Sequence, residues 1–316
     1  MNKTIGLAGF YDEQILYLRK KIKNANFIDI NKNNSNAILN SLNALICITE
    51  SELDKLFLED QPSNYKNLDW VHASSAGIDN YRHVLSNINF TFTCGRIIQG
   101  PNVADHAMAL LLSLTRRLPW CIKGVDKFKM PRPTELKNKK VLIIGLGGIG
   151  TLIAERCNAF GMVVSSIDKF MKPLYSFIEN QYLPKDLDYA LSHSDVIIVS
   201  SPLTNSTDEM LGYKELNRMQ DDAYLINISR GKIIDLLALD KILNKGKLSG
   251  VGLDVTYPEV LKSNHPLFKY ERVIITPHIA GMSTDNKRRF NLIERNIENY
   301  LSNSTLLNIV DKEEGF

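Results

Sequence analysis

Short apolar runs alternate with polar segments of helical spacing along the first hundred residues. Residues 4–10, 44–49 and 89–95 are rich in aliphatic and aromatic side chains and predict strands. Residues 13–24 lie between the first two of these runs and predict a helix with one apolar and one basic face. Strand, helix and strand in succession indicate a parallel sheet with crossover helices.

A second alternating series follows a polar linker over residues 123–140. The run VLIIGLG predicts a strand, GIGTLIAERCNAFG a helix and VVSSID another strand. Four later runs also predict strands, and several are apolar almost throughout, as in strands buried on both faces: DVIIVSS, AYLINIS, LSGVGLDV and RVIITPH. A last helix is expected from about residue 284 to 301. The pattern predicts an α/β chain with two doubly wound parallel-sheet domains.

Between the two series, the sequence predicts a helix that begins at about Pro101 and is apolar from Val103 to Leu118. A helix this apolar needs cover on most sides. We therefore expect it to lie between two domains or against another subunit, and a homodimer is the expected assembly. His106 within it is interpreted as a structural histidine rather than a ligand.

Composition narrows the class of protein. Of 316 residues, 44% are hydrophobic and 23% charged, as in soluble globular proteins. A net charge of +3 gives no argument for nucleic-acid binding, and no apolar run is long enough to span a bilayer. No signal peptide and no metal site are expected. The four cysteines form no C-x-x-C pair and are predicted to be buried free thiols in a reducing compartment, the cytoplasm.

A glycine loop follows the first strand of the second series. Gly145, Gly147 and Gly150 have G-x-G-x-x-G spacing. The first glycine allows a tight turn, the second a close approach of a pyrophosphate, and the third the packing of helix on strand. The helix N-terminus adds free N–H groups for phosphate oxygens. This order of elements predicts dinucleotide binding, and the alternative is a glycine-rich turn without a ligand.

The next predicted strand ends at Asp168, which can accept hydrogen bonds from the hydroxyls of an adenosine ribose. NADP carries a phosphate there, so a carboxylate favours NAD, and NADP is the less expected cofactor. Lys169 and Lys172 favour NADP instead, because either side chain could pair with that phosphate.

Four segments resemble, in order and spacing, signature segments of the D-isomer-specific 2-hydroxyacid dehydrogenases: SSAGIDN, LINISRGKIID, LSGVGLDVTYPEV and VIITPHIAG. Glyoxylate/hydroxypyruvate reductase-like members look most similar. The resemblance implies a flavodoxin-like substrate domain over residues 1–98, with residues 283–316 returning to it, and a Rossmann-like NAD-binding domain over residues 99–282. The implied reaction is NAD(H)-dependent interconversion of a small 2-keto acid and a D-2-hydroxy acid.

The resemblance assigns catalytic roles to Arg230, Glu259 and His278. Residue chemistry agrees, because the arginine fork matches a carboxylate and a histidine can give and take a proton near neutral pH. A neighbouring carboxylate orients the ring and favours its protonated form. Taken alone, Glu259 could be a solvated loop acid and His278 a core histidine.

The resemblance also implies the binding residues. Cofactor contacts are expected at Gly145, Gly147, Gly148, Ile149, Gly150, Asp168, Pro202, Ile228 and Asp254. Asp254 would lie near the nicotinamide carboxamide. The backbone of Ser75, Ala76 and Gly77 would bind the substrate carboxylate together with Arg230, and the alternative for this loop is a plain turn before a helix.

A second hypothesis is a non-catalytic NAD(H)-sensing binding protein of the same fold. The intact catalytic residues are compatible with it, but no peptide-binding extension is visible in the sequence. The sequence does not name the side chain of the substrate.

Overall fold

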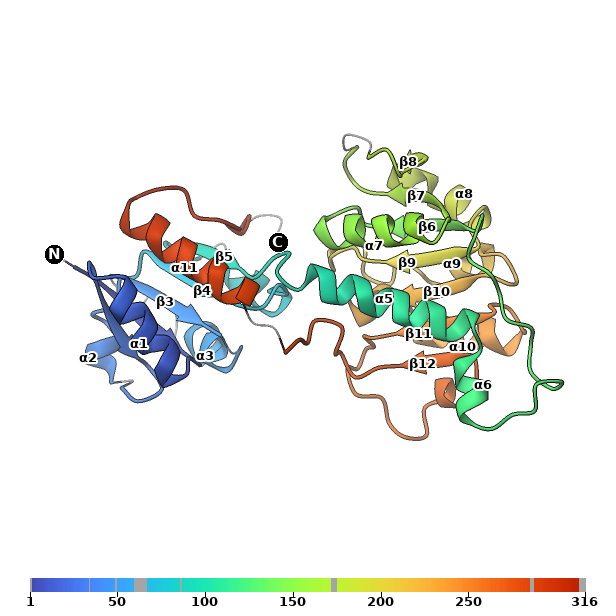
Figure 1. Ribbon diagram of the computed structural model, residues 1–316, viewed down its shortest axis with the longest axis horizontal. Coiled ribbons are helices and arrows are strands. Elements are labelled where there is room, and N and C mark those ends of the chain that lie inside the picture. Colours follow the sequence, from blue (N-terminus) through green and yellow to red (C-terminus); the bar gives the residue numbers. More distant parts are fainter. Residues whose placement is uncertain are drawn as a thin grey trace. The chain divides into compact units, whose positions relative to one another are not determined.

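A computed structural model shows two units, each built around a parallel sheet (Figure 1). The structure describes residues 2–33, 35–48, 50–59, 67–85, 87–171, 175–284 and 287–312. Unit 1 comprises Met1–Gln99 and Ser283–Phe316, and unit 2 comprises Gly100–Met282. The C-terminal segment thus belongs to the same unit as the N-terminal hundred residues.

Unit 1 contains a five-stranded sheet in the order β2-β1-β3-β4-β5, with every neighbouring pair parallel. This is the flavodoxin-like order. Its strands and helices are β1 (Lys3–Ala8), α1 (Asp12–Lys21), β2 (Ala25–Asp29), α2 (Asn36–Leu39), β3 (Ala44–Cys47), α3 (Glu50–Asp54), β4 (Trp70–Ala73), α4 (Arg82–Leu85), β5 (Thr91–Cys94) and α11 (Lys287–Leu301). The predicted last helix is therefore observed from Lys287, and residues 285 and 286 lie outside the described part of the chain.

Alternate side chains of the unit 1 strands enter two separate apolar cores. Ile5 and Leu7 of β1 pack with α1 and α11 on one face. Ala73 of β4 and Phe92 of β5 pack with the segments around α3 and α4 on the other. Because both faces are covered, these strands read as apolar runs rather than as alternating patterns.

Unit 2 contains a seven-stranded parallel sheet in the order β12-β11-β10-β9-β6-β7-β8. The order reverses between β6 and β9, as in doubly wound nucleotide-binding folds. Its strands and helices are α5 (Gly100–Thr115), α6 (Leu118–Ile122), β6 (Lys140–Ile144), α7 (Gly148–Ala159), β7 (Val163–Ile167), β8 (Asn180–Tyr182), α8 (Leu187–Ser192), β9 (Val196–Val199), α9 (Tyr213–Arg218), β10 (Tyr224–Asn227), α10 (Leu236–Asn244), β11 (Gly250–Leu253) and β12 (Val273–Ile275).

The apolar helix α5 lies against β10, β11, β12 and α7 of its own unit (Figure 1). Gly250 and Gly252 of β11 leave room for it, because a Cβ at these glycines would lie 3.1 and 3.0 Å from the Cβ atoms of Leu114 and Leu110. The cover of α5 thus comes from unit 2 itself. The sequence analysis expected a second domain or subunit to supply this cover, and a contact of α5 with another subunit stays a prediction.

The cysteine prediction holds for three of four residues. Cys47, Cys94 and Cys157 are buried and form no disulfide, whereas Cys121 on α6 is exposed. The run around Cys121 is apolar, but α6 is a short helix that buries Trp120 and leaves its other face open. No helix within the described residues has the length and apolar character needed to cross a bilayer.

Candidate active site

The predicted site residues of unit 2 all follow strands of one parallel sheet. Because parallel strands end at the same edge, these residues gather at the carboxyl edge, where such folds bind ligands. Gly145 follows β6, Asp168 follows β7, Pro202 follows β9, Ile228 and Arg230 follow β10, Asp254 and Glu259 follow β11, and His278 follows β12.

The glycine loop has the shape that a pyrophosphate needs. A Cβ on Gly145 would lie 2.6 Å from the backbone of Ser201, and one on Gly150 would lie 2.0 Å from the carbonyl oxygen of Gly145. Gly145 also has φ +93°, a conformation that glycine adopts readily. Gly147, by contrast, borders open space, and no side chain caps the helix that begins at Gly148. The first-turn N–H groups, including those of Ile149 and Gly150, therefore suit a phosphate.

Asp168 folds back onto the glycine loop. Its Oδ2 accepts a hydrogen bond of 2.7 Å from the backbone N–H of Leu146, and its Oδ1 accepts one of 3.1 Å from Phe170. The residue is half-buried. It therefore places a fixed negative charge beside the loop, while Lys169 is exposed and Lys172 lies outside the described residues.

Arg230 is presented by a tight turn after β10. The side chain of the fully buried Asn227 holds this turn, because its Nδ2 donates to the Arg230 carbonyl at 2.9 Å and its Oδ1 accepts from Ser229 N–H at 3.1 Å. Gly231 then passes so close to Thr256 that a Cβ there would lie 2.1 Å from the Thr256 carbonyl carbon. The arginine turn and the loop after β11 are consequently packed on one another.

Asp254 follows β11, and its carboxylate holds the loop that carries His278. Its side chain is 1% exposed, and both carboxylate oxygens face the segment from Thr276 to Ala280. Oδ1 accepts hydrogen bonds from Thr276 Oγ1 at 2.6 Å and from Ile279 N–H at 3.0 Å, and Oδ2 accepts one from Ala280 N–H at 2.9 Å. A buried carboxylate is stable only when it is paired with donors in this way.

His278 and Glu259 form a pair at this edge. His278 Nδ1 lies 2.7 Å from Glu259 Oε1, and both side chains are exposed, at 49% and 69%. His278 has a left-handed backbone (φ +55°) and donates its N–H to the carbonyls of Asp254 and Thr276. Thr256 donates to the carbonyls of Pro258 and Glu259, which shapes the turn that carries the acid.

The candidate loop of unit 1 follows β4. Ser75 and Gly77 are half-buried, and Ser75 Oγ donates to the Gly77 carbonyl at 3.2 Å. Gly95 N–H donates to Ser75 O, and a Cβ on Gly95 would lie 2.1 Å from the Ser74 carbonyl oxygen. Among the described residues, no acceptor faces the N–H groups of Ser75, Ala76 and Gly77. These groups suit an anion.

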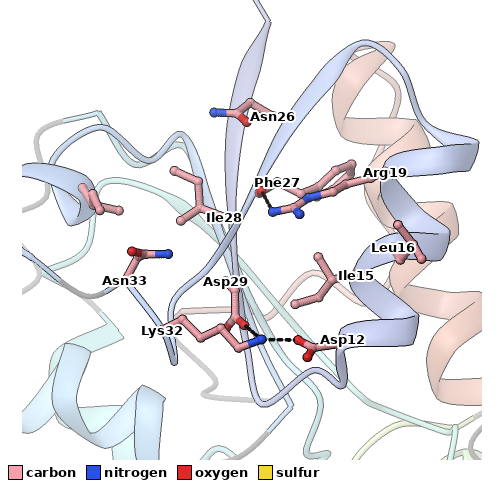
Figure 2. A pocket seen from close by; sticks show the side chains of 11 residues that line it. Asp12, Ile15, Leu16, Arg19, Asn26, Phe27, Ile28, Asp29, Lys32 and Asn33 are labelled. Carbon is pink, nitrogen blue, oxygen red and sulfur yellow. Dashed lines mark hydrogen bonds and ion pairs between the residues drawn. The ribbon is translucent and has the colours of Figure 1, made fainter.

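A hollow of about 650 Å³ lies elsewhere in unit 1, between α1 and the edge strand β2 (Figure 2). Its charged groups are already engaged. Lys32 pairs with Asp12 and with Asp29, and Arg19 donates to the carbonyl of Phe27 at 2.7 Å. None of the predicted site residues lines it.

The sequence analysis missed three residues that shape the site: Asn227, Thr256 and Thr276. They are small polar residues at strand ends, where a hydrogen bond to the backbone is common and has no sequence signature of its own. His106 was interpreted as structural, and its Nε2 does have a partner, Thr276 Oγ1 at 2.9 Å.

Comparison with known proteins identifies the protein family. The model of the D-isomer specific 2-hydroxyacid dehydrogenase NAD binding domain matches residues 108–280. A glyoxylate reductase of Thermofilum pendens is 31% identical over 291 residues, which cover 85% of this chain and 81% of the relative.

Two solved structures have the same fold. A D-isomer specific 2-hydroxyacid dehydrogenase family protein from Aeromonas salmonicida matches with a TM-score of 0.83 and 24% identity, over 99% of this chain and 100% of that one. D-Lactate dehydrogenase from Aquifex aeolicus, solved with NAD and lactic acid, matches with a TM-score of 0.72 and 25% identity, over 95% and 96%.

The chain belongs to the D-isomer-specific 2-hydroxyacid dehydrogenase family. It is an NAD-dependent oxidoreductase that interconverts a 2-keto acid and a D-2-hydroxy acid. The family, the fold class and the reaction class expected from the sequence are confirmed.

Proposed function

We propose that this chain reduces a small 2-keto acid with NADH, with His278 as the proton donor and Arg230 as the anchor of the substrate carboxylate. The observation that carries the proposal is the 2.7 Å contact between His278 Nδ1 and Glu259, at the sheet edge that also bears the glycine loop. With Nδ1 occupied by the carboxylate, Nε2 is left to exchange a proton with the substrate oxygen.

Each residue has one task in this proposal. Bound NADH supplies the hydride that reaches the carbonyl carbon. Arg230 offers a planar fork of donors that fixes the carboxylate. His278 gives its proton to the carbonyl oxygen in reduction and takes it back in oxidation. Glu259 orients the imidazole through its contact with Nδ1.

The cofactor contacts follow from the geometry of unit 2. We assign the pyrophosphate to the N–H groups of the helix that starts at Gly148, and the adenosine ribose to Asp168. Pro202 follows β9, which lies beside β6, and Ile228 follows β10, the next strand of the sheet. Both are assigned to the walls of the cofactor site. Asp254 is assigned to the nicotinamide end, through the loop that it holds. In unit 1, we assign a substrate carboxylate to the N–H groups of Ser75, Ala76 and Gly77.

The substrate is proposed to have a small side chain, since a glyoxylate reductase is among the relatives. The test is oxidation of NADH by the purified protein with glyoxylate, hydroxypyruvate and pyruvate in turn, followed by chiral analysis of the product. Turnover with at least one acid, and a D-product from the prochiral acids, is expected. NADH binding without turnover of any 2-keto acid would overturn the proposal and favour the NAD(H)-sensing role.

The proposed assembly is a homodimer in the cytoplasm. Ile122 on α6 and Phe128 are 84% and 85% exposed, and we assign these two apolar side chains to the interface, because the centre of a homodimer interface is apolar. The buried cysteines, which form no disulfide, fit a reducing compartment. Sedimentation velocity should give a dimer that Ile122→Glu weakens, and a monomeric native protein would contradict this.

A further inference from the structure

His106 reaches the loop of the proposed proton donor from a distant part of the chain. It lies on α5, which packs along β11 and β12 (Figure 1). Its Nε2 is 2.9 Å from Thr276 Oγ1 and 3.2 Å from Asp254 Oδ1. The His106 side chain is only 19% exposed. A side chain that is mostly buried makes most of its hydrogen bonds with protein groups.

The direction of these hydrogen bonds follows from counting protons. Thr276 Oγ1 lies 2.6 Å from Asp254 Oδ1 and donates its single proton to it. Thr276 Oγ1 has no second proton, so His106 Nε2 must be the donor in their contact. The chain of donors therefore runs from His106 to Thr276 to Asp254, and it fixes the tautomer of His106 with the proton on Nε2.

The same hydrogen-bond network holds the segment that carries His278. Asp254 accepts the backbone N–H groups of Ile279 and Ala280, and its carbonyl accepts that of His278. His278 stands between Thr276 and Ile279 with a left-handed backbone. That conformation is uncommon outside glycine and persists only where surrounding contacts hold it. A loosened Thr276 would free one end of the segment.

We propose that His106 is a positioning residue for the proton transfer. By donating to Thr276 Oγ1, it locks the Asp254–Thr276 pair and so fixes the direction of the His278 imidazole. The inference rests on the proposed role of His278 as the proton donor. His106 touches neither substrate nor cofactor in this role, and it acts only through Thr276 and Asp254.

The test compares variants of the full chain in NADH-dependent reduction of the best acid among glyoxylate, hydroxypyruvate and pyruvate. His106→Leu should lower kcat about 10- to 100-fold, because small misplacements of a reacting group have effects of this size. The Kd of NADH, measured by fluorescence, should change by no more than about threefold. His106→Gln should recover most of kcat, since its amide can place a donor near the position of Nε2. His193→Leu is the matched control, because His193 directly follows α8 and is exposed, and it should leave kcat unchanged.

Thr276→Val and Thr276→Ser provide a second route that leaves His106 intact. The valine variant, which removes only the hydroxyl, should lower kcat as His106→Leu does, and the serine variant should keep it. The double variant His106→Leu/Thr276→Val should be no slower than the slower single variant, because the two residues act in one chain. Thermal unfolding of each variant shows whether it is folded at the assay temperature. If His106→Leu is not folded, the Thr276 pair decides the question.

Three results would overturn the inference: a kcat above half of the native value in folded His106→Leu, an unchanged kcat in Thr276→Val, or multiplied losses in the double variant. His278→Ala separates this failure from that of the proposed function. Full activity of His278→Ala would overturn the proposed function itself. A normal His106→Leu beside an inactive His278→Ala would overturn the positioning role alone.

Discussion

The loop that follows β4 in unit 1 and the loop that follows β12 in unit 2 differ in how many of their polar groups form hydrogen bonds. After β12, Asp254 collects a hydroxyl and two backbone N–H groups, and the loop is pinned. After β4, Ser74 Oγ is buried without a hydrogen-bond partner in the described structure, and the next three N–H groups have no acceptor there.

The difference matches two kinds of task. A group that transfers a proton must be held in one geometry before the substrate arrives, and internal hydrogen bonds provide this. A loop that binds an anion needs donors that are not already used. At strand ends, backbone groups with internal hydrogen bonds thus indicate a fixed loop, and backbone N–H groups without them indicate an anion-binding loop.

Among substitutions that keep the charge of a side chain, the largest effect is expected at Arg230, the proposed anchor of the substrate carboxylate. Arg230→Lys should lower kcat/KM on the order of 100-fold, with a higher KM and a lower kcat, because an ammonium cannot reproduce a bidentate contact. Arg218→Lys on α9 is the control for an arginine outside the site. Ordinary kinetics in Arg230→Lys would mean that another group holds the carboxylate.

A second effect concerns the strand beneath the unit 1 loop. Burial lowers the pKa of His72 on β4 from 6.5 to about 4, and its side chain is 0% exposed. Between these values the unfolded chain binds the proton and the folded chain does not, so stability is lost as pH falls from about 6.5 towards about 4. From pH 7 to pH 5 this amounts to about 2 kcal/mol.

Denaturant titrations at the two pH values measure this loss. His72→Asn should lose about 2 kcal/mol less than the native chain on going from pH 7 to pH 5. The exposed His193→Asn should behave like the native chain. Equal losses in the native chain and in His72→Asn would show that the buried histidine does not titrate as described.

The third effect is a loss of orientation on the β12 side. Glu259→Gln replaces the carboxylate that lies 2.7 Å from His278 Nδ1 with a neutral amide, which forms a weaker hydrogen bond to the ring. The kcat of reduction should fall about 10-fold, because small misplacements of a reacting group lower the rate. An unchanged kcat would rule out the pairing.

The smallest effect is expected at Asp168. Like Asp254, this aspartate directly follows a strand, but it is only half-buried. The native chain should prefer NADH to NADPH, and Asp168→Ser should narrow the ratio of the two kcat/KM values by about tenfold, because a surface charge repels the extra phosphate only modestly. A native preference for NADPH would show that nearby lysines set the choice.

The sequence predicted those parts of the molecule that depend on local pattern. Apolar runs marked β6, β9, β10 and β11, and glycine spacing marked the loop at Gly145. The strands β2 and β8 were not predicted, because they lie at sheet edges, where fewer apolar side chains are needed.

Other features depended on tertiary contacts. The packing of α5 on its sheet depends on two glycines of β11, more than a hundred residues away, that leave room for the helix, and no helical pattern contains that information. The partnership of His106 with Thr276 has the same origin, since a sequence separation of 170 residues is closed only by packing.

The most direct test of the account is single-turnover reduction by His278→Ala. General acid catalysis contributes on the order of 10² to 10⁴-fold, so the hydride-transfer rate from bound NADH should fall by that factor while the Kd of NADH stays near the native value. The fluorescence of NADH reports both quantities in one stopped-flow experiment. A rate above half of the native value would contradict the claim that the loop pinned by Asp254 carries the proton donor.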